Sequence, residues 1–147
     1  MITLHPIDIN DDKTKESYAN PDCQELFKTY REFYKKIGYN PPWIGYFVIR
    51  DNLVVGCCGF VSQPNNTKVE IAYWTFKQFE GQGVSSESCK QLVAMTRQTD
   101  PTIIITAKTL PEHNASTKIL ERNGFVLTGP ATDEDGKDVW EWTCKNS

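Results

Sequence analysis

Two glycines in front of a predicted helix form the part of the sequence whose residue types best suit chemistry. They lie in residues 78–83 (QFEGQG), and the apolar residues of the next segment recur at three- and four-residue spacing, as on one helix face. Glycine lets the main chain approach a ligand closely, and the first helical turn has unpaired N–H groups at the positive end of its dipole. The loop is therefore a candidate binding site for a phosphate or diphosphate.

The same glycines also fit an ordinary tight turn between a strand and a helix. The sequence contains neither G-x-G-x-x-G nor G-x-x-x-x-G-K-[ST], the two common phosphate-binding motifs. The segment that starts at Lys68 alternates in polarity and is rich in β-branched and aromatic residues, which predicts a half-buried strand before the loop. The loop by itself leaves both interpretations open.

A second motif makes the first more specific. The pattern Q-x-x-G-x-G formed by Gln78, Gly81 and Gly83 resembles the acyl-CoA pyrophosphate loop of the GNAT N-acetyltransferases, Q/R-x-x-G-x-G/A. Residues 114–116 (NAS) and 120–125 (LERNGF) resemble a signature of the GNAT branch that includes the ribosomal-protein N-terminal (RimJ/RimL-like) acetyltransferases. Two motifs in the right order and spacing are far more specific than one. The resemblance covers the chain from about Val54 to the C-terminus.

The resemblance implies a site for acetyl-CoA as co-substrate, without a metal. In the family, the pantetheine arm lies between two strands that splay apart, and the pyrophosphate sits on the main chain of the glycine loop. The cofactor-binding residues implied here are Ile71, Ala72, Tyr73, Trp74, Gln78, Phe79, Glu80, Gly81, Gln82, Gly83, Val84, Ser85 and Asn114. Asn114 also suits a helix N-cap, and both roles are compatible.

Acyl transfer to an amine requires a group that takes a proton, because an ammonium with a pKa near ~10 is no nucleophile at neutral pH. Many GNAT enzymes place a glutamate at the start of the fourth strand, so the resemblance implies that Glu70 is the catalytic base, directly or through water. An alternating strand also places a glutamate on its solvent side for solubility alone. His113, a residue type that titrates near neutral pH, is a rival base or an ordinary exposed side chain.

The sequence departs from the family at the position of the usual general acid. Many members carry a tyrosine in the helix before Gly-Phe, and the matching residue here is Leu120. Tyr73 or water are substitutes, and a thiolate needs little help to leave because thiols are fairly acidic. A nucleophile made of Cys57 or Cys58 with His113 is a further alternative, against which buried structural thiols are commoner.

Composition sets further limits. The 147 residues predict a single domain covering residues 1–147, and a net charge of −3 argues against general nucleic-acid binding. The sequence has no apolar run of membrane-spanning length and no secretory signal at its N-terminus. Its five cysteines include no C-x-x-C pair and no His/Cys cluster at zinc spacing. We therefore expect a cytoplasmic protein with reduced thiols. The sequence leaves a monomer and a homodimer both open.

Turn signals divide the chain into alternating strands and helices. Helices are predicted at residues 21–37, 84–98 and 114–123, with Asn20 as the first N-cap. Strands are predicted at residues 2–7, 43–50, 53–62, 68–74, 103–105, 125–129 and 139–144. The strand-helix-strand succession predicts a parallel pair. The predicted fold is mixed α/β, with antiparallel N-terminal strands, a parallel pair around a helix and helices on both faces, as in GNAT folds.

Three functions are compatible with these features. The first is an N-acetyltransferase in which a primary amine, from a protein N-terminus or a small molecule, attacks the thioester of acetyl-CoA directly. The second is an acyl-CoA-binding module without catalysis, which Leu120 in place of tyrosine favours. The third is a phosphate loop for another nucleotide.

Overall fold

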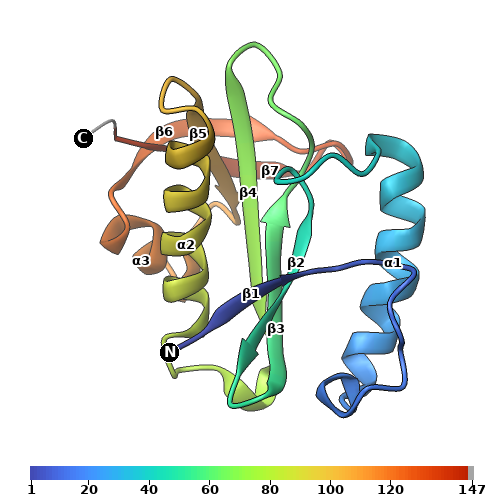
Figure 1. Cartoon of the computed structure of the whole chain (residues 1–147). Coiled ribbons are helices and arrows are strands. Elements are labelled where there is room, and N and C mark those ends of the chain that lie inside the picture. The colour runs from blue at the N-terminus through green and yellow to red at the C-terminus, as the bar shows by residue number, and fades with distance from the viewer. Residues whose placement is uncertain (146–147) are drawn as a thin grey trace.

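The apolar runs of the sequence form seven strands of one mixed sheet, in the order β1-β2-β3-β4-β5-β7-β6 (Figure 1). The computed structural model describes residues 1–145. The strands are β1 (Thr3–Pro6), β2 (Gly45–Arg50), β3 (Leu53–Phe60), β4 (Lys68–Thr75), β5 (Ile104–Thr109), β6 (Phe125–Thr132) and β7 (Asp138–Cys144). Helix α1 (Pro21–Ile37) lies on one face of the sheet, and α2 (Val84–Thr99) and α3 (Ala115–Arg122) lie on the other. The predicted mixed α/β architecture is confirmed.

Local signals in the sequence fix the first helix and the first hairpin. The side chain of Asn20 accepts the N–H of Asp22 at 2.9 Å, Pro21 occupies the first turn of α1, and Gly38 ends the helix with φ +82°. Asp51 and Asn52 join β2 to β3 with positive φ angles of 52° and 65°. This is the backbone of a tight hairpin turn, which asparagine and aspartate tolerate better than most residues.

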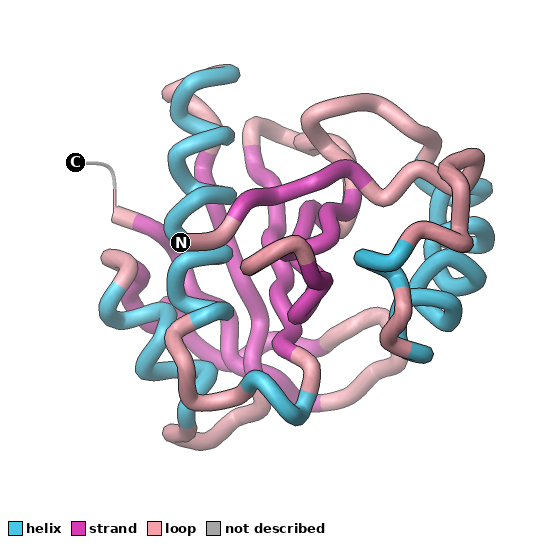
Figure 2. The backbone as a smooth tube through the Cα atoms, turned by 60° about the horizontal axis from the view of Figure 1, so that its bottom comes forward, coloured by secondary structure: helices cyan, strands magenta, loops and turns pink. Residues whose placement is uncertain are grey.

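The core lies in two layers, one on each face of the sheet, and Figure 2 shows the strands between the two groups of helices. Phe27 of α1 packs with Phe47 of β2 and with Cys57 in a cluster of buried residues on one side. Leu92 of α2 and Leu120 of α3 belong to the larger cluster. The burial of apolar side chains on both faces is the main force that holds the helices against the sheet.

The pairing between two parallel strands, β4 and β5, stops before either strand ends. The pairing of β4 with β5 runs from Lys68 opposite Ile104 to Ile71 opposite Ala107. Beyond this point β4 continues to Thr75 paired with β3, while β5 continues paired with β7. The helix α2 connects the two strands, as the predicted crossover requires. The parting of β4 and β5 provides the gap that the family resemblance implies.

Two strands extend further than the sequence predicted. Strand β5 continues through Thr106 and Lys108 to Thr109, whereas the prediction covered only the apolar run at residues 103–105. Its second half alternates buried Ala107 and Thr109 with the half-buried Lys108, a pattern that an apolar-run criterion misses. Strand β6 reaches Thr132, beyond the predicted end at residue 129, because β7 pairs with it along its length.

Candidate active site

The main chain of the glycine loop that leads into α2 is not covered by side chains at its two glycines. Gly81 and Gly83 have φ angles of +77° and +79°, a region in which side chains are strained. A Cβ built at either glycine would meet nothing within 4 Å, so both face open space. Gly83 is the N-cap of α2 and provides no side-chain cap, and the N–H groups of a first helical turn have no intrahelical partners. The loop therefore offers main-chain donors at the positive end of a helix dipole.

These glycines line a cavity of 520 Å³ that adjoins the separation between β4 and β5. Its walls come from the second half of β4, the glycine loop, the first turn of α2 and one face of α3. The lining residues are Tyr73, Trp74, Thr75, Phe79, Glu80, Gly81, Gly83, Val84, Ser85, Ser86, Ala115, Ser116, Lys118, Ile119 and Arg122. Eight of these are among the cofactor-binding residues predicted from the sequence: Tyr73, Trp74, Phe79, Glu80, Gly81, Gly83, Val84 and Ser85.

Four predicted residues next to these lie outside the lining. Ile71 is buried in the core and Ala72 is exposed, and neither residue lines the cavity. Gln78 is exposed in a short 3-10 turn before the glycines. Gln82 is exposed, and its side-chain oxygen accepts a hydrogen bond from Arg50 at 2.5 Å.

Asn114 acts as the N-cap of α3. Its side-chain oxygen accepts the N–H of Thr117 at 3.1 Å, while the hydroxyl of Thr117 accepts the N–H of Asn114 at 2.9 Å. This reciprocal capping box accounts for the asparagine through helix stability alone. The residue lies outside the set that lines the 520 Å³ cavity, although its neighbours Ala115 and Ser116 belong to that set. Its contact with the cofactor stays a prediction.

Sequence reasoning missed two cationic residues of the cavity wall. Lys118 and Arg122 lie one turn apart on α3 and both line the cavity. The glycine loop and the first turn of α2 line the same cavity. Their four-residue spacing, within the stretch that holds the second motif, was a readable sign of a basic helix face next to a phosphate site.

Tyr73 connects β4 to α3 across the cavity. Its hydroxyl donates to the main-chain oxygen of Ser116 at 3.1 Å and lies 3.4 Å from the Ser116 hydroxyl. Burial raises the pKa of Tyr73 to about 12, so its hydroxyl stays protonated at neutral pH. Leu120, at the position of the usual tyrosine, is fully buried and belongs to the main apolar cluster. Tyr73 is therefore the tyrosine that this cavity offers as a proton donor.

A second cavity, of 420 Å³, lies on the other face of β4. Glu70 lines it, and because side chains alternate along a strand, Glu70 points away from the side of Tyr73. The remaining lining residues are Phe33, Val61, Lys108, Thr109, Leu110, Asp133, Glu134, Asp135 and Val139. The Lys108 ammonium lies 3.1 Å from the Glu70 carboxylate. The predicted base thus borders a cavity of its own, beside the parting strands.

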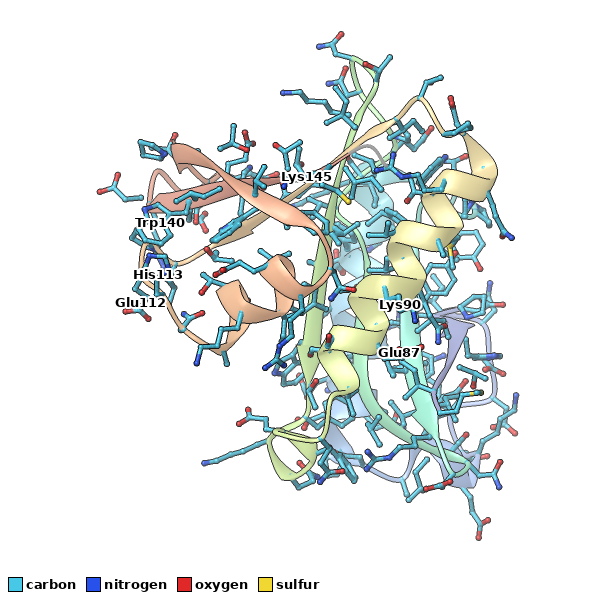
Figure 3. All side chains as sticks on the ribbon, turned by 90° about the vertical axis from the view of Figure 1, so that its left-hand side faces the viewer. Glu87, Lys90, Glu112, His113, Trp140 and Lys145 are labelled. Atoms are coloured by element: carbon cyan, nitrogen blue, oxygen red, sulfur yellow. The ribbon has the colours of Figure 1, made fainter. Side chains whose placement is uncertain are left out.

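His113 and the cysteines are not among the lining residues of either cavity. His113 is exposed and packs edge-on against Trp140, with ring centroids 5.0 Å apart, at an edge of the molecule away from α2 (Figure 3). All five cysteines are free and buried. Burial raises the pKa of Cys57 to about 12, so it lacks the exposed, electropositive surroundings of a reactive thiolate. The geometry does not support a Cys/His nucleophile.

The sequence matches the model of the acetyltransferase (GNAT) domain over residues 2–126, which is most of the chain. The chain belongs to the GNAT acetyltransferase family. This GNAT protein contains no helix within residues 1–145 that is both long and apolar enough to cross a membrane. Within the same range, no group of three or more His, Cys, Asp or Glu side chains is placed to hold a metal ion.

Two relatives of this GNAT protein are named as acetyltransferases. It is 31% identical over 80 residues to YdaF of Bacillus subtilis, whose name places it provisionally among the ribosomal N-acetyltransferases; the match covers 52% of this chain and 44% of YdaF. It is 26% identical over 85 residues to the ribosomal-protein-serine acetyltransferase of Escherichia coli, covering 57% of this chain and 48% of that enzyme. The matches thus span about half the length of these two relatives.

Solved structures share the fold over almost the whole chain. The ribosomal alpha-N-protein acetyltransferase RimL superposes with a TM-score of 0.71 at 20% identity, covering 99% of this chain and 93% of RimL. A RimL structure in complex with coenzyme A gives a TM-score of 0.68 at 20% identity, covering 97% of this chain and 92% of RimL. A chimera of the spermidine N-acetyltransferase SpeG of Vibrio cholerae gives 0.70 at 16% identity, covering 99% and 95%. At these identities the likeness concerns the fold.

Proposed function

We propose that this GNAT protein transfers the acetyl group of acetyl-CoA to a primary amine, with Glu70 as the base. One observation carries the proposal: β4 and β5 separate after Ile71 and Ala107, with the glycine-loop cavity on one face of β4 and the Glu70 cavity on the other. A thioester carried between the separated strands is accessible to an amine from the opposite face. Positioning of two substrates in this way supplies much of the acceleration of a bimolecular reaction.

The residues of the first cavity fit the anionic part of acetyl-CoA. Gly81, Gly83 and the first turn of α2 present main-chain N–H groups to a diphosphate without an intervening side chain. Lys118 and Arg122 add two positive charges from α3, which suit further phosphate oxygens. Glu80 lines the same cavity, and its charge opposes an anion, so we expect its side chain to turn toward solvent on binding.

In the transfer step, Glu70 takes one proton from the acceptor ammonium, directly or through water. The nitrogen lone pair then forms a bond to the thioester carbon, the C–S bond breaks with its electron pair on sulfur, and the second proton on nitrogen leaves to water to give the neutral amide. Main-chain N–H groups of β4 beyond Ile71 that turn toward β5 have no strand opposite them in the register and are placed to stabilise the oxyanion. The thiolate gains a proton from the Tyr73 hydroxyl, which solvent reprotonates, or from water.

The names of the relatives suggest acceptors to test. One acts on the serine of a ribosomal protein, and a fold neighbour is a spermidine acetyltransferase. We propose a panel of acceptors made of peptides with N-terminal serine or alanine, and spermidine. Release of free thiol from acetyl-CoA, with mass spectrometry of the product, measures transfer. Turnover with at least one amine supports the proposed function.

A module that binds acyl-CoA without catalysis is a second candidate, favoured by the burial of Leu120 at the usual tyrosine position. Thermal unfolding distinguishes the two. Acetyl-CoA raises the melting temperature under both functions, because it binds only the folded state. We expect ATP and NAD to leave the melting temperature unchanged. Stabilisation by acetyl-CoA without turnover for any amine of the panel favours the binding module. Equal stabilisation by ATP contradicts both functions and favours a general nucleotide site.

A further inference from the structure

An ion pair connects β4 and β5 at the 420 Å³ cavity, where we expect the acceptor amine to bind. The Lys108 ammonium on β5 lies 3.1 Å from a carboxylate oxygen of Glu70 on β4, and the side chains are 29% and 26% exposed. Glu70 lies opposite Thr106 in the parallel register, one position before the last pair. Lys108 lies two residues beyond Thr106 on the same face of β5, past the point where the strands part. The ion pair therefore reaches across the start of the gap.

Lys108 is the one cationic residue among the lining of the 420 Å³ cavity within the described chain. Three carboxylates of the β6–β7 turn, Asp133, Glu134 and Asp135, line the same cavity with Glu70. The cavity therefore holds four acidic side chains and one ammonium of its own. An ammonium that occupies the position next to Glu70 excludes a second ammonium there, because like charges at such a distance repel.

We propose that Lys108 is the resident counter-ion of Glu70, and that the ammonium of the acceptor displaces it on binding. The inference rests on the proposed function, since it takes Glu70 as the group that receives the acceptor amine. Before displacement, Lys108 fixes the carboxylate at the start of the gap and keeps it paired. After displacement, its four-carbon stem lets its ammonium move toward the carboxylates of the turn or to solvent. Lys108 is thus a positioning residue that competes with the substrate.

The competition has a measurable consequence for cation affinity. In Lys108→Met, Glu70 is unpaired, and an amine ligand no longer has to displace an internal ammonium. Isothermal titration calorimetry with spermidine as the probe, without acetyl-CoA, measures this directly and needs no turnover. We expect spermidine to bind Lys108→Met about fivefold or more tightly than the wild type. Lys108→Arg, which keeps a cation next to Glu70, retains wild-type affinity within about twofold.

Two controls separate displacement from a change in overall charge. Lys90→Met removes a positive charge from the exposed side of α2 and leaves spermidine affinity within about twofold of wild type. In a Glu70→Gln background, Lys108→Met adds less than about twofold, because the gain acts through Glu70. Circular dichroism and thermal unfolding establish that each variant is folded.

Each outcome decides the proposal. Unchanged or weaker spermidine binding in Lys108→Met overturns it, and so does a gain of the same size in the Glu70→Gln background, which indicates a general electrostatic effect. Should Lys108→Met not fold, Lys108→Gln replaces it with the same expectations. The proposed function fails separately, through absence of turnover in the wild type. For an accepted amine, Lys108→Met lowers KM with kcat within about twofold, a division that a purely structural role does not produce.

Discussion

The two cavities on either side of β4 are built by different means. The glycine-loop cavity is formed mainly by one continuous segment, from Tyr73 to Ser86, and its defining groups are main-chain N–H donors and small residues. The Glu70 cavity gathers side chains from α1, β4, β5 and the β6–β7 turn, which are far apart in the sequence. A site made of contiguous backbone leaves a motif in the sequence, while one assembled from distant side chains does not. The reaction class is therefore easier to predict from the sequence than the identity of the acceptor amine.

The cavities also differ in charge. The helix dipole, Lys118 and Arg122 make the first suitable for a polyanion. Four carboxylates against Lys108 make the second suitable for a cation. The sheet thus separates an anion-binding region from a cation-binding region, and the opening between β4 and β5 is where they adjoin. This opposition matches the two substrates of an amine acetyltransferase.

The largest expected effect is on the acceptor side. Glu70→Gln keeps the size of the side chain but removes the carboxylate that we propose receives the amine proton, so we expect kcat to fall by about 100-fold or more while affinity for acetyl-CoA stays within about twofold. Steady-state kinetics and calorimetry measure the two quantities. Glu25→Gln, on the exposed face of α1, is the matched control and keeps wild-type kinetics. Unchanged transfer in Glu70→Gln would remove Glu70 from the mechanism.

The next effect is on the cofactor side. Gly81→Val places a branched side chain at the loop and obstructs its main-chain donors, which raises the Kd for acetyl-CoA by about 30-fold, equivalent to about 2 kcal/mol. Gly136→Val is a closely matched control, because Gly136 also has φ +77° and open space around its Cβ position, but lies in the β6–β7 turn.

The two valine variants separate backbone strain from ligand contact. Both lose stability to a similar extent, since each forces a branched residue to positive φ. Only Gly81→Val loses acetyl-CoA affinity if the loop binds the diphosphate. Equal affinity of the two variants for acetyl-CoA would mean that the glycines serve only the turn into α2. The glycine-loop cavity would then not be the binding site for the diphosphate.

Sequence reasoning located the elements better than it located the contacts. Caps and turns at Asn20, Gly38 and Asn52 fixed helix and hairpin positions, because these signals act within a few residues. The second half of β5 was missed because it is not an apolar run, and the strand that pairs with it, β7, lies far along the chain. The pairing of Lys108 with Glu70 depends on the same long-range arrangement. The family resemblance pointed to Glu70, whereas its partner Lys108, contributed by a separate strand, had no signal in the sequence.

A smaller effect tests the basic face of α3. Lys118→Ala and Arg122→Ala together raise the Kd for acetyl-CoA by about fivefold, because contacts of exposed cations with phosphate are worth about 0.5 kcal/mol each. The loss decreases at high salt, which screens such contacts. Calorimetry at two ionic strengths measures both effects. Lys90→Ala, an exposed lysine on α2, serves as the control and leaves Kd unchanged. Salt-independent affinity in the wild type argues against these contacts.

The smallest effect concerns the proton that returns to sulfur. Tyr73→Phe removes the hydroxyl that bonds to Ser116, but a thiolate leaves readily without an acid, so kcat falls by only about threefold. Because burial raises the pKa of Tyr73 to about 12, its hydroxyl keeps its proton between pH 7 and pH 10, and the ratio of wild-type to Tyr73→Phe rates stays constant there. Rate measurements over this pH range, with the exposed Tyr39→Phe as control, check the ratio. A loss of 100-fold or more in kcat would make Tyr73 an essential acid. Proton donation to the sulfur, in the glycine-loop cavity, would then matter at least as much as proton removal by Glu70.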